Sequence, residues 1–174
     1  MQTVNLTVER IDVSANALIT NLFEYYLHDM AEWFLFDTEA DGHYGYDMAK
    51  HWQRGDEVYI ARCAGQLAGF ALVTSARPWL PQGDGYDMEE FFVIRRYRHT
   101  GAGEALAKAV WDMHPGQWLV RVYEGNVPAI PFWRKIISRY TQDRHVEERR
   151  IVNGKAWAFF HFKSRDRPER QLTC

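Results

Sequence analysis

A strand-like segment that leads through a basic cluster and a glycine pair into a helix constrains this chain more than any other feature. Its sequence is FFVIRRYRHTGAGEALAKAVW, residues 91–111. Gly101 and Gly103 carry no side chain where a backbone could approach a ligand, and a helix that begins there exposes unpaired N–H groups and the positive end of its dipole. Since Arg98 adds positive charge, the segment predicts a binding site for phosphate or pyrophosphate.

The residues around these glycines exclude two nucleotide-binding motifs. The chain has no G-x-x-x-x-G-K-[ST] sequence, and Leu106 occupies the third glycine position of G-x-G-x-x-G. The formal net charge is −2, which gives no general attraction for polyanions. The anion site must therefore be local, and nucleic-acid binding fits poorly.

The size and composition of the chain are those of one soluble domain. It has 174 residues, of which 47% are apolar and 25% charged. We expect residues 1–164 to form a single domain and residues 165–174 to be a frayed tail. No apolar run approaches the ~20 residues of a membrane-spanning helix, and the N-terminus lacks a signal-peptide pattern. A cytoplasmic location without membrane attachment is expected.

The spacing of apolar residues predicts the order of the secondary-structure elements. Strands are expected at 3–13, in a hairpin over 57–75, at 86–94, at 117–124 and in a last hairpin that turns at Asn153-Gly154; helices are expected at 14–34, 101–113 and 126–140. The long loop 37–57 is expected to hold one short helix. This order predicts an α/β class with a largely antiparallel sheet.

Two longer patterns carry a resemblance to a known family. VIRRYRHTGAG, which begins at Val93, resembles the acetyl-CoA signature of the GNAT superfamily of N-acetyltransferases, whose core is [QR]-x-x-G-x-[GA]. NVPAIPFW, which begins at Asn126, is similar to the N-x-x-A-x-x-[FL]-[YW] segment of that superfamily. The resemblance implies the GNAT fold, with a central, mixed, mostly antiparallel sheet of about seven strands flanked by helices.

The resemblance also implies acetyl-CoA as the co-substrate and indicates the residues that would hold it. The pantetheine arm and acetyl carbonyl would meet backbone groups of Phe91, Phe92 and Val93, and the pyrophosphate would meet Arg98, His99, Thr100, Gly101, Ala102, Gly103 and the N–H of Glu104. Asn126 would hydrogen-bond the pantetheine, while Phe132 and Trp133 would pack near the thioester. Gly103→Trp is accordingly expected to abolish acetyl-CoA binding without unfolding the domain.

Three carboxylates on the preceding strand are the candidates for the base that accepts the amine proton. They are Asp87, Glu89 and Glu90, and strand alternation predicts Asp87 and Glu89 on one face with Phe91 and Val93, and Glu90 on the other. Some members of the superfamily have a glutamate base at the position of Asp87. Others have it at the position of Arg121, so the sequence leaves all three carboxylates open. A solvated strand edge is the alternative interpretation.

The acid that protonates the departing thiolate is less clear from the sequence. The resemblance implies a tyrosine where this chain has Trp133, and an indole N–H is far too weak an acid. Tyr140, Tyr123 or water could serve instead, or no protein acid is needed. The same departure keeps open a non-catalytic acyl-CoA-binding or sensor domain as the alternative function.

The acidic loop suggests what the acceptor is. Asp37, Glu39, Asp41 and Asp47 alternate there with His43, Tyr44 and Tyr46. Such a rim would attract a cationic amine, although a solvated loop has the same composition. We therefore expect acetyl transfer from acetyl-CoA directly to a primary amine of a small molecule, in preference to a peptide or protein. The histidines show no metal-ligand spacing, so no metal is expected, and the last hairpin could supply a homodimer interface.

Overall fold

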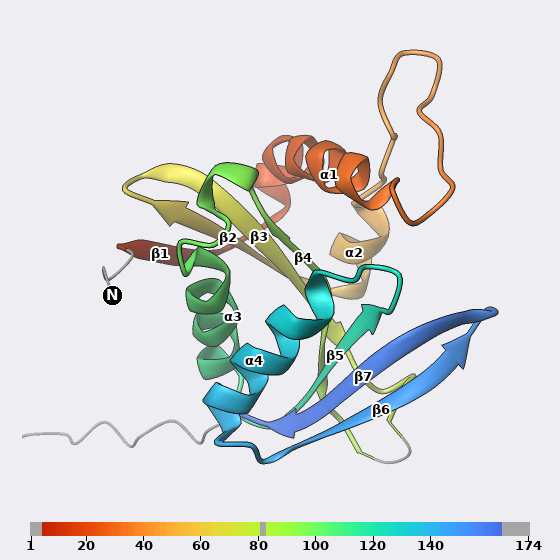
Figure 1. Ribbon diagram of the computed structural model, residues 1–174. Helices are drawn as coiled ribbons and strands as arrows, with labels where there is room; N and C mark the ends of the chain where they lie inside the picture. The colour runs from red at the N-terminus through yellow and green to blue at the C-terminus, as the bar shows by residue number, and fades with distance from the viewer. Residues whose placement is uncertain (1–4, 81–82, 165–174) are drawn as a thin grey trace, which may run out of the picture.

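A seven-stranded mixed sheet with helices on both faces forms the centre of the molecule (Figure 1). The computed structural model describes residues 5–80 and 83–164. The strands are β1 (Leu6–Ile11), β2 (Glu57–Cys63), β3 (Gln66–Ser75), β4 (Tyr86–Val93), β5 (Gln117–Tyr123), β6 (His145–Val152) and β7 (Lys155–Lys163), in the spatial order β1-β2-β3-β4-β5-β7-β6. Neighbours are antiparallel except β4 and β5, which are parallel. The expected fold class is confirmed.

The helices fall close to the expected ranges. They are η1 (Val13–Ala15), α1 (Asn16–Met30), α2 (Ala49–Arg54), η2 (Arg95–Tyr97), α3 (Ala102–Met113) and α4 (Ala129–Thr141). The helix expected over 14–34 is shorter at both ends, and α4 begins only after Pro128. Pro131 lies in the first turn of α4, where its missing N–H removes no helical hydrogen bond. The expected frayed tail, 165–174, lies outside the described residues.

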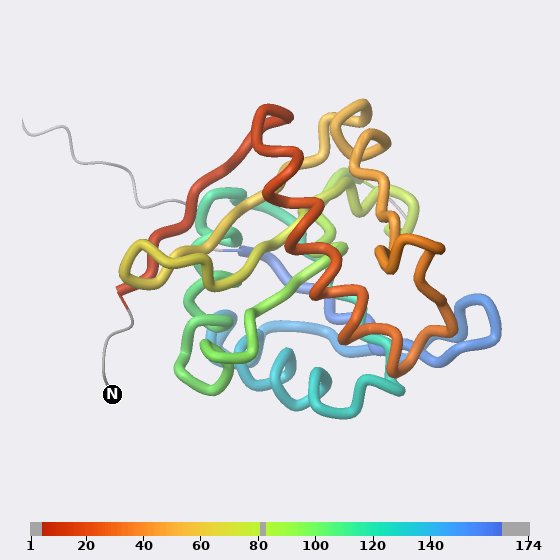
Figure 2. The backbone as a smooth tube through the Cα atoms, turned by 90° about the horizontal axis from the view of Figure 1, so that it is seen from above, coloured from red at the N-terminus to blue at the C-terminus, as the bar shows by residue number. Residues whose placement is uncertain are grey.

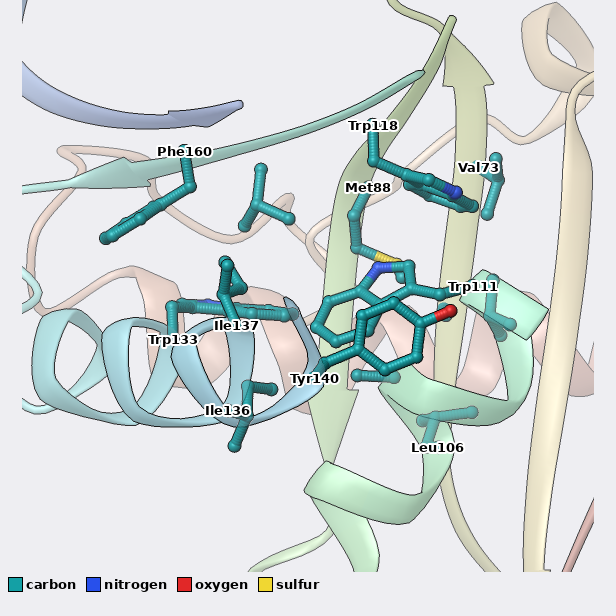
Figure 3. Packing of buried hydrophobic residues seen from close by; sticks show 14 of the residues in the cluster. Val73, Met88, Leu106, Trp111, Trp118, Trp133, Ile136, Ile137, Tyr140 and Phe160 are labelled. Carbon is teal, nitrogen blue, oxygen red and sulfur yellow. The ribbon is translucent and has the colours of Figure 1, made fainter. Parts of the chain in front are cut away.

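Two apolar layers hold the helices against the sheet. On one face, α3 and α4 pack Leu106, Trp111, Trp133 and Ile137 into a core with inward-facing strand residues (Figure 3). On the other face, α1 buries Ile19, Leu22 and Phe23 against β2, β3 and β4. The helical spacing of these residues places them on one stripe of each helix.

The two parts of the sheet are joined over a short distance and then separate. β4 and β5 pair only at Tyr86↔Trp118, Asp87↔Leu119 and Met88↔Val120. Immediately after this ladder β4 contains a bulge, because Val73 of β3 pairs with Met88 and Leu72 pairs with Glu90. A bulge bends its strand and increases the local twist. The bend carries the end of β4 away from β5.

The bulge also changes which residues share a face of the sheet. Glu89 is the extra residue in β4, so the alternation shifts by one position after Met88. Phe91 packs toward α3 and α4, whereas Phe92 packs under α1 beside Phe70. The predicted grouping of Asp87 and Glu89 with Phe91 and Val93 is therefore wrong. Glu90 lies on the face opposite Phe91, as predicted, together with Phe92, and contacts α1 through Tyr26.

The segment after α1 lies beside the β6–β7 hairpin, as Figure 2 shows. Nζ of Lys155 in the hairpin donates to the carbonyl of Trp33 at 3.3 Å. The ring of Phe34 lies 5.0 Å from that of Tyr123 and 6.1 Å from that of Trp157. These contacts close one end of the space between β4 and β5.

Candidate active site

A cavity of about 340 Å³ lies where β4 and β5 separate. Its polar lining comes from the two strands, as Glu89, Glu90, Arg121 and Tyr123, and from Asn126 before α4. Its aromatic lining includes Tyr26 of α1, Phe34 and Phe36 shortly after α1, Tyr46 of the long loop, Phe91 of β4, Trp133 of α4 and Trp157 of β7. The fold thus encloses two carboxylates within aromatic walls.

Glu90 has the environment of a carboxyl group with a shifted pKa. Its Oε2 accepts a hydrogen bond from the hydroxyl of Tyr26. Burial raises the pKa of Glu90 to about 7, although the Tyr26 hydrogen bond opposes the shift. Such a group changes protonation state near neutral pH, as a general base must.

Glu89 lines the same cavity but is more open to solvent. As the bulged residue of β4 it has no partner residue in β3. Its side chain is 31% exposed, and its Oε2 lies 3.7 Å from Nη2 of Arg54. Glu89 therefore adds negative charge beside Glu90 in the cavity.

Asp87 is buried beneath the cavity against Arg121. Its Oδ2 accepts from Nε and Nη2 of Arg121 at 2.8 and 2.7 Å, and its side chain is 1% exposed. Burial raises the pKa of Asp87 to about 6, although Arg121 opposes that shift. Thus the structure brings Glu89 and Glu90 to the cavity, while Asp87 joins β4 to β5.

The two tyrosines considered as acids occupy different places. Tyr123 lines the cavity. Tyr140 lies in the core between α3 and α4 (Figure 3), 3% exposed, and its hydroxyl donates to Oδ1 of Asp112 at 2.7 Å. The suggestion that Tyr140 protonates the thiolate is therefore wrong. Trp133 occupies the cavity wall, with its ring 4.8 Å from that of Phe91.

The glycine-rich loop has the backbone geometry of an anion site. Gly101 precedes α3 with a φ of 94°, a left-handed conformation that favours glycine. His99 also has a positive φ, of 63°. No side chain in the described part of the chain caps the first turn of α3, so the amides from Ala102 to Glu104 face outward. This end of the helix fits a pyrophosphate.

Gly103 lies against α4 and the end of β4. A Cβ atom there would lie 3.2 Å from Cζ of Phe132 and 3.4 Å from Cγ2 of Val93. A larger side chain would push against these residues, and Phe132 packs on the main core. The expectation that Gly103→Trp obstructs the loop and not the core is therefore wrong.

Several charges of the loop are already paired within the protein. Arg98 forms an ion pair with Asp29 of α1, and its Nε donates to the carbonyl of Val93 at 2.8 Å. Arg95 contacts the same Asp29 at 2.7 Å. Glu104 pairs with Lys108 at 2.7 Å. The side chain of Arg98 is thus directed to α1, and the predicted anion site is left to the backbone of residues 98–104.

The acidic residues of the long loop do not form the wall of the cavity. Asp37, Glu39, Asp41 and Asp47 are all exposed. From the predicted rim, Tyr46 reaches the cavity, and its ring stacks on Phe23 at 4.2 Å. The negative charge at the cavity comes instead from Glu89 and Glu90 of β4.

A polar network beside Tyr46 was not predicted from the sequence. Its hydroxyl lies 2.7 Å from Nε2 of His51, and Nδ1 of His51 lies 2.9 Å from Oδ2 of Asp56. His51, Asp56 and Glu89 each place one possible metal-ligand atom within 4.8 Å of the others. Arg54 lies among them, 2.5 Å from Asp56 and 3.7 Å from Glu89. We therefore interpret the cluster as an ion-pair network.

The fold and the site together define a class of protein. In it, two parallel strands of a mixed sheet, here β4 and β5, separate at a cavity, and the first turn of a neighbouring helix fits a pyrophosphate. The model of the Acetyltransferase (GNAT) family matches residues 26–137. The chain belongs to this family, and the expected fold and enzyme class are confirmed. No curated protein sequence matches the chain.

Solved structures agree with this assignment of the fold. A GNAT-family acetyltransferase from Streptococcus agalactiae 2603 has a TM-score of 0.67 at 13% identity, over 95% of this chain and 99% of that one. The structure of yncA from Salmonella typhimurium with its cofactor acetyl-CoA has a TM-score of 0.59 at 15% identity, over 97% and 99%. The aminoglycoside acetyltransferase AAC(6')-Ib in complex with coenzyme A has a TM-score of 0.66 at 13% identity, over 91% and 95%. Acetyl-CoA as the expected co-substrate agrees with the family and with these complexes.

Proposed function

We propose that the protein transfers an acetyl group from acetyl-CoA directly to a primary amine of a small molecule, with Glu90 as the general base. The observation that carries this proposal is the position of Glu90, at the cavity between the separated strands, with a pKa of about 7. Direct transfer requires a neutral amine, an acceptor for its proton and a fixed attack geometry.

The residues around the cavity and loop have separate tasks in this proposal. The first turn of α3, from Ala102 to Glu104, binds the pyrophosphate, with residues 98–101 around it. Acetyl-CoA supplies the activated acyl group. Phe91, Asn126 and Trp133 line the cavity along β4 and α4, where they would hold the pantetheine arm. Phe132 closes this path beside Gly103.

The walls of the cavity favour a small cationic acceptor. Glu89 and Glu90 place carboxylates at one end, and the rings of Tyr26, Phe36 and Tyr46 surround the space. Carboxylates and aromatic faces both attract an ammonium group. The similarity to an aminoglycoside acetyltransferase is consistent with this acceptor class, although its low identity supports the fold alone.

Calorimetry with acetyl-CoA, followed by a free-thiol assay, tests the proposal. The assay would use kanamycin, spermidine, tyramine and a lysine-containing peptide as acceptors. We expect binding of acetyl-CoA and release of CoA with at least one small amine, and loss of that release in Glu90→Gln. Binding without release for any acceptor would favour the alternative, a non-catalytic acyl-CoA sensor. Absence of binding would contradict both.

Two properties stay as proposals about the whole chain. Within residues 5–80 and 83–164, no helix is long and apolar enough to cross a bilayer. We propose a cytoplasmic protein without nucleic-acid partners.

We also propose a homodimer through the last hairpin, because β6 is an edge strand on which Val146 and Ile151 are each 62% exposed. Light scattering of the purified protein would test the second proposal.

A further inference from the structure

Three hydrogen-bonded side chains connect the active-site cavity with a second cavity. Tyr46 lines the first cavity, and Asp56 lines the second, whose volume is about 470 Å³. Between them lies His51, which is 1% exposed. Its Nε2 is 2.7 Å from Oη of Tyr46, and its Nδ1 is 2.9 Å from Oδ2 of Asp56. The hydrogen bonds thus form a continuous path from one cavity to the other through the buried imidazole of His51.

The end of α2 fixes this arrangement. Gly55 ends the helix with a φ of 75°, a left-handed conformation typical of a helix C-terminus. The chain then turns back, and the amide of Asp56 donates to the carbonyl of His51 at 3.0 Å. This turn holds the carboxylate of Asp56 next to the His51 ring. On the other side, Tyr46 is fixed by stacking on Phe23 and on the His51 ring itself.

Burial keeps both ring systems neutral near pH 7. Burial lowers the pKa of His51 and outweighs the opposing effects of Asp56 and Glu89, while Arg54 also lowers it. Burial, together with Glu90 and Glu89, raises the pKa of the Tyr46 hydroxyl well above its usual value, although Arg54 opposes this. Lys50 lies 4.7 Å from the Tyr46 ring. A neutral hydroxyl and a neutral imidazole can each accept one proton while they give up another.

Both tautomers of His51 have partners in this structure. With its proton on Nδ1, the ring donates to Asp56 and Nε2 accepts from Tyr46. With its proton on Nε2, the ring donates to the Tyr46 oxygen and Nδ1 accepts from Nη2 of Arg54, which is 2.9 Å away. Because neither form leaves a buried nitrogen without a partner, the ring can change tautomer at low cost.

We propose that Tyr46, His51 and Asp56 carry the proton of an incoming ammonium group out of the active-site cavity. The proposal rests on the proposed function, since an alkyl amine with a pKa near ~10 arrives protonated at neutral pH. The N–H bond of the ammonium breaks and its proton moves to Oη of Tyr46, while the hydroxyl proton moves to Nε2 of His51. The Nδ1 proton then passes to Asp56 and to water in the second cavity.

The remaining protons balance within the same site. During attack the amine nitrogen loses a second proton, which Glu90 accepts and later releases to water. The reverse shift through Asp56, His51 and Tyr46 delivers a proton to the departing sulfur and restores the first tautomer. One proton is released per turnover. Tyr46 is the catalytic residue of this relay, and His51 and Asp56 act through it.

The pH dependence of Tyr46→Phe tests the relay. The variant keeps the ring stacked on Phe23 but removes the hydroxyl. With the best acceptor of the panel, we expect kcat/KM to fall about tenfold or more relative to the unmodified enzyme near pH 6.5, and to lie within about twofold near pH 9.5. At high pH the amine enters neutral, and the thiolate can leave without a proton because a free thiol ionises near pH ~8.5, so neither step of the relay is needed. His51→Gln and Asp56→Asn should show the same dependence, with unchanged affinity for acetyl-CoA.

A matched control is available in Tyr59→Phe. The Tyr59 hydroxyl lies 2.6 Å from Nε2 of His114 and 2.6 Å from Oε2 of Glu57, and Tyr59 is outside the set of residues that line the active-site cavity. This variant should lose a comparable hydrogen bond without a pH-dependent loss of activity. A deficit of Tyr46→Phe that is equal at all pH values would overturn the relay.

Nitrogen-15 NMR of His51 in the enzyme without substrates gives a second, independent readout. We expect a neutral ring at pH 7 whose Nε2 shift changes in Tyr46→Phe. A charged ring at pH 7, or no change in that variant, would contradict the relay even if acetyl transfer occurs. If the unmodified enzyme acetylates no amine, the proposed function fails, while the NMR result still decides whether the hydrogen-bonded chain exists.

Discussion

At the scale of single residues, two carboxylates three positions apart in β4 have different environments. Glu90 accepts from Tyr26 beside the cavity, whereas Asp87 pairs with Arg121 beneath it. Burial raises the pKa of both groups, to about 7 and about 6. Because only Glu90 also faces the acceptor space, the two side chains should respond differently to substitution.

Glu90→Gln should remove a titration from both activity and stability. For the unmodified enzyme, kcat/KM should rise with pH and level off above about 7 as Glu90 ionises. Since its folded pKa is raised above the usual 4.5, the folded state binds more protons between these values, and the free energy of unfolding should fall as pH rises through that range. The variant should lose about 100-fold in kcat and show a flatter stability curve. Measured pH–rate and urea-unfolding profiles that match the unmodified enzyme would exclude Glu90 as the base.

Asp87→Asn should affect stability more than chemistry. It would leave the Arg121 guanidinium, whose side chain is 15% exposed, without its carboxylate. Breaking a buried ion pair costs about 3 kcal/mol, and the Tm should fall by roughly 6–12 °C. Thermal unfolding followed by circular dichroism checks this. An unchanged Tm together with loss of the kcat/KM rise near pH 7 would transfer the role of base to Asp87.

At the scale of elements, the first turn of α3 and the start of α4 are packed closely at Gly103, where even a methyl group would press against its neighbours. This contact places the loop from Arg98 to Gly103 beside the end of β4, where Val93 also lies. The proposed cofactor loop is therefore positioned by three elements together, and changes in their packing should appear as changes in acetyl-CoA affinity.

Gly103→Ala should weaken acetyl-CoA binding without lowering stability. Overpacking against Phe132 and Val93 should raise the Kd about tenfold or more. In the helix, alanine is favoured over glycine by about 1 kcal/mol, which offsets the strain. Calorimetry and thermal unfolding measure the two effects. Gly65→Ala is the control for affinity, because Gly65 lies in the β2–β3 turn with a φ of 80°, so alanine there should lower stability by backbone strain and leave the Kd unchanged. An unchanged Kd for Gly103→Ala would contradict the assigned loop.

At the scale of the whole molecule, the two parts of the sheet are joined by a short parallel ladder between β4 and β5. A ligand that lies between these strands would bridge β1–β4 and the β5-β7-β6 group. Binding should therefore slow local opening on both sides of the cavity as well as shift the folding equilibrium.

Acetyl-CoA at 100 times its Kd should stabilise the fold by about 2.7 kcal/mol and raise the Tm by roughly 5–10 °C. Hydrogen exchange should slow at residues 89–93 and 121–123. Adenosine 3′,5′-bisphosphate, which lacks the pantetheine arm, is the control and should leave the amides of β5 unchanged. Protection confined to the α3 loop with acetyl-CoA would show that the pantetheine does not lie between the strands.

Local patterns were sufficient to predict most elements and the family. Hydrophobic spacing predicted the helices over α3 and α4, since each buries one stripe, and Asn153-Gly154 predicted the last turn. The residues VIRRYRHTGAG indicated the anion loop because its geometry depends on nearby glycines and on a helix start. Such features need only neighbours in sequence, so the chain determines them by itself.

The tertiary structure decided which side chains meet. The bulge at Glu89 arises from the pairing of β3 with β4, and it separates Asp87 from the face of Phe91. Glu90 lies opposite Phe91, as alternation predicted, and only the fold brings it to Tyr26, 64 positions away in sequence. The pairing of Asp87 with Arg121 and the contact of Tyr46 with His51 likewise depend on how strands and loop come together. Strand alternation assumes a regular ladder, and burial depends on elements distant in sequence. The sequence by itself therefore determined the family and indicated the proposed cofactor loop, whereas only the folded molecule favoured Glu90 as the proposed base, because its surroundings come from elements distant in sequence.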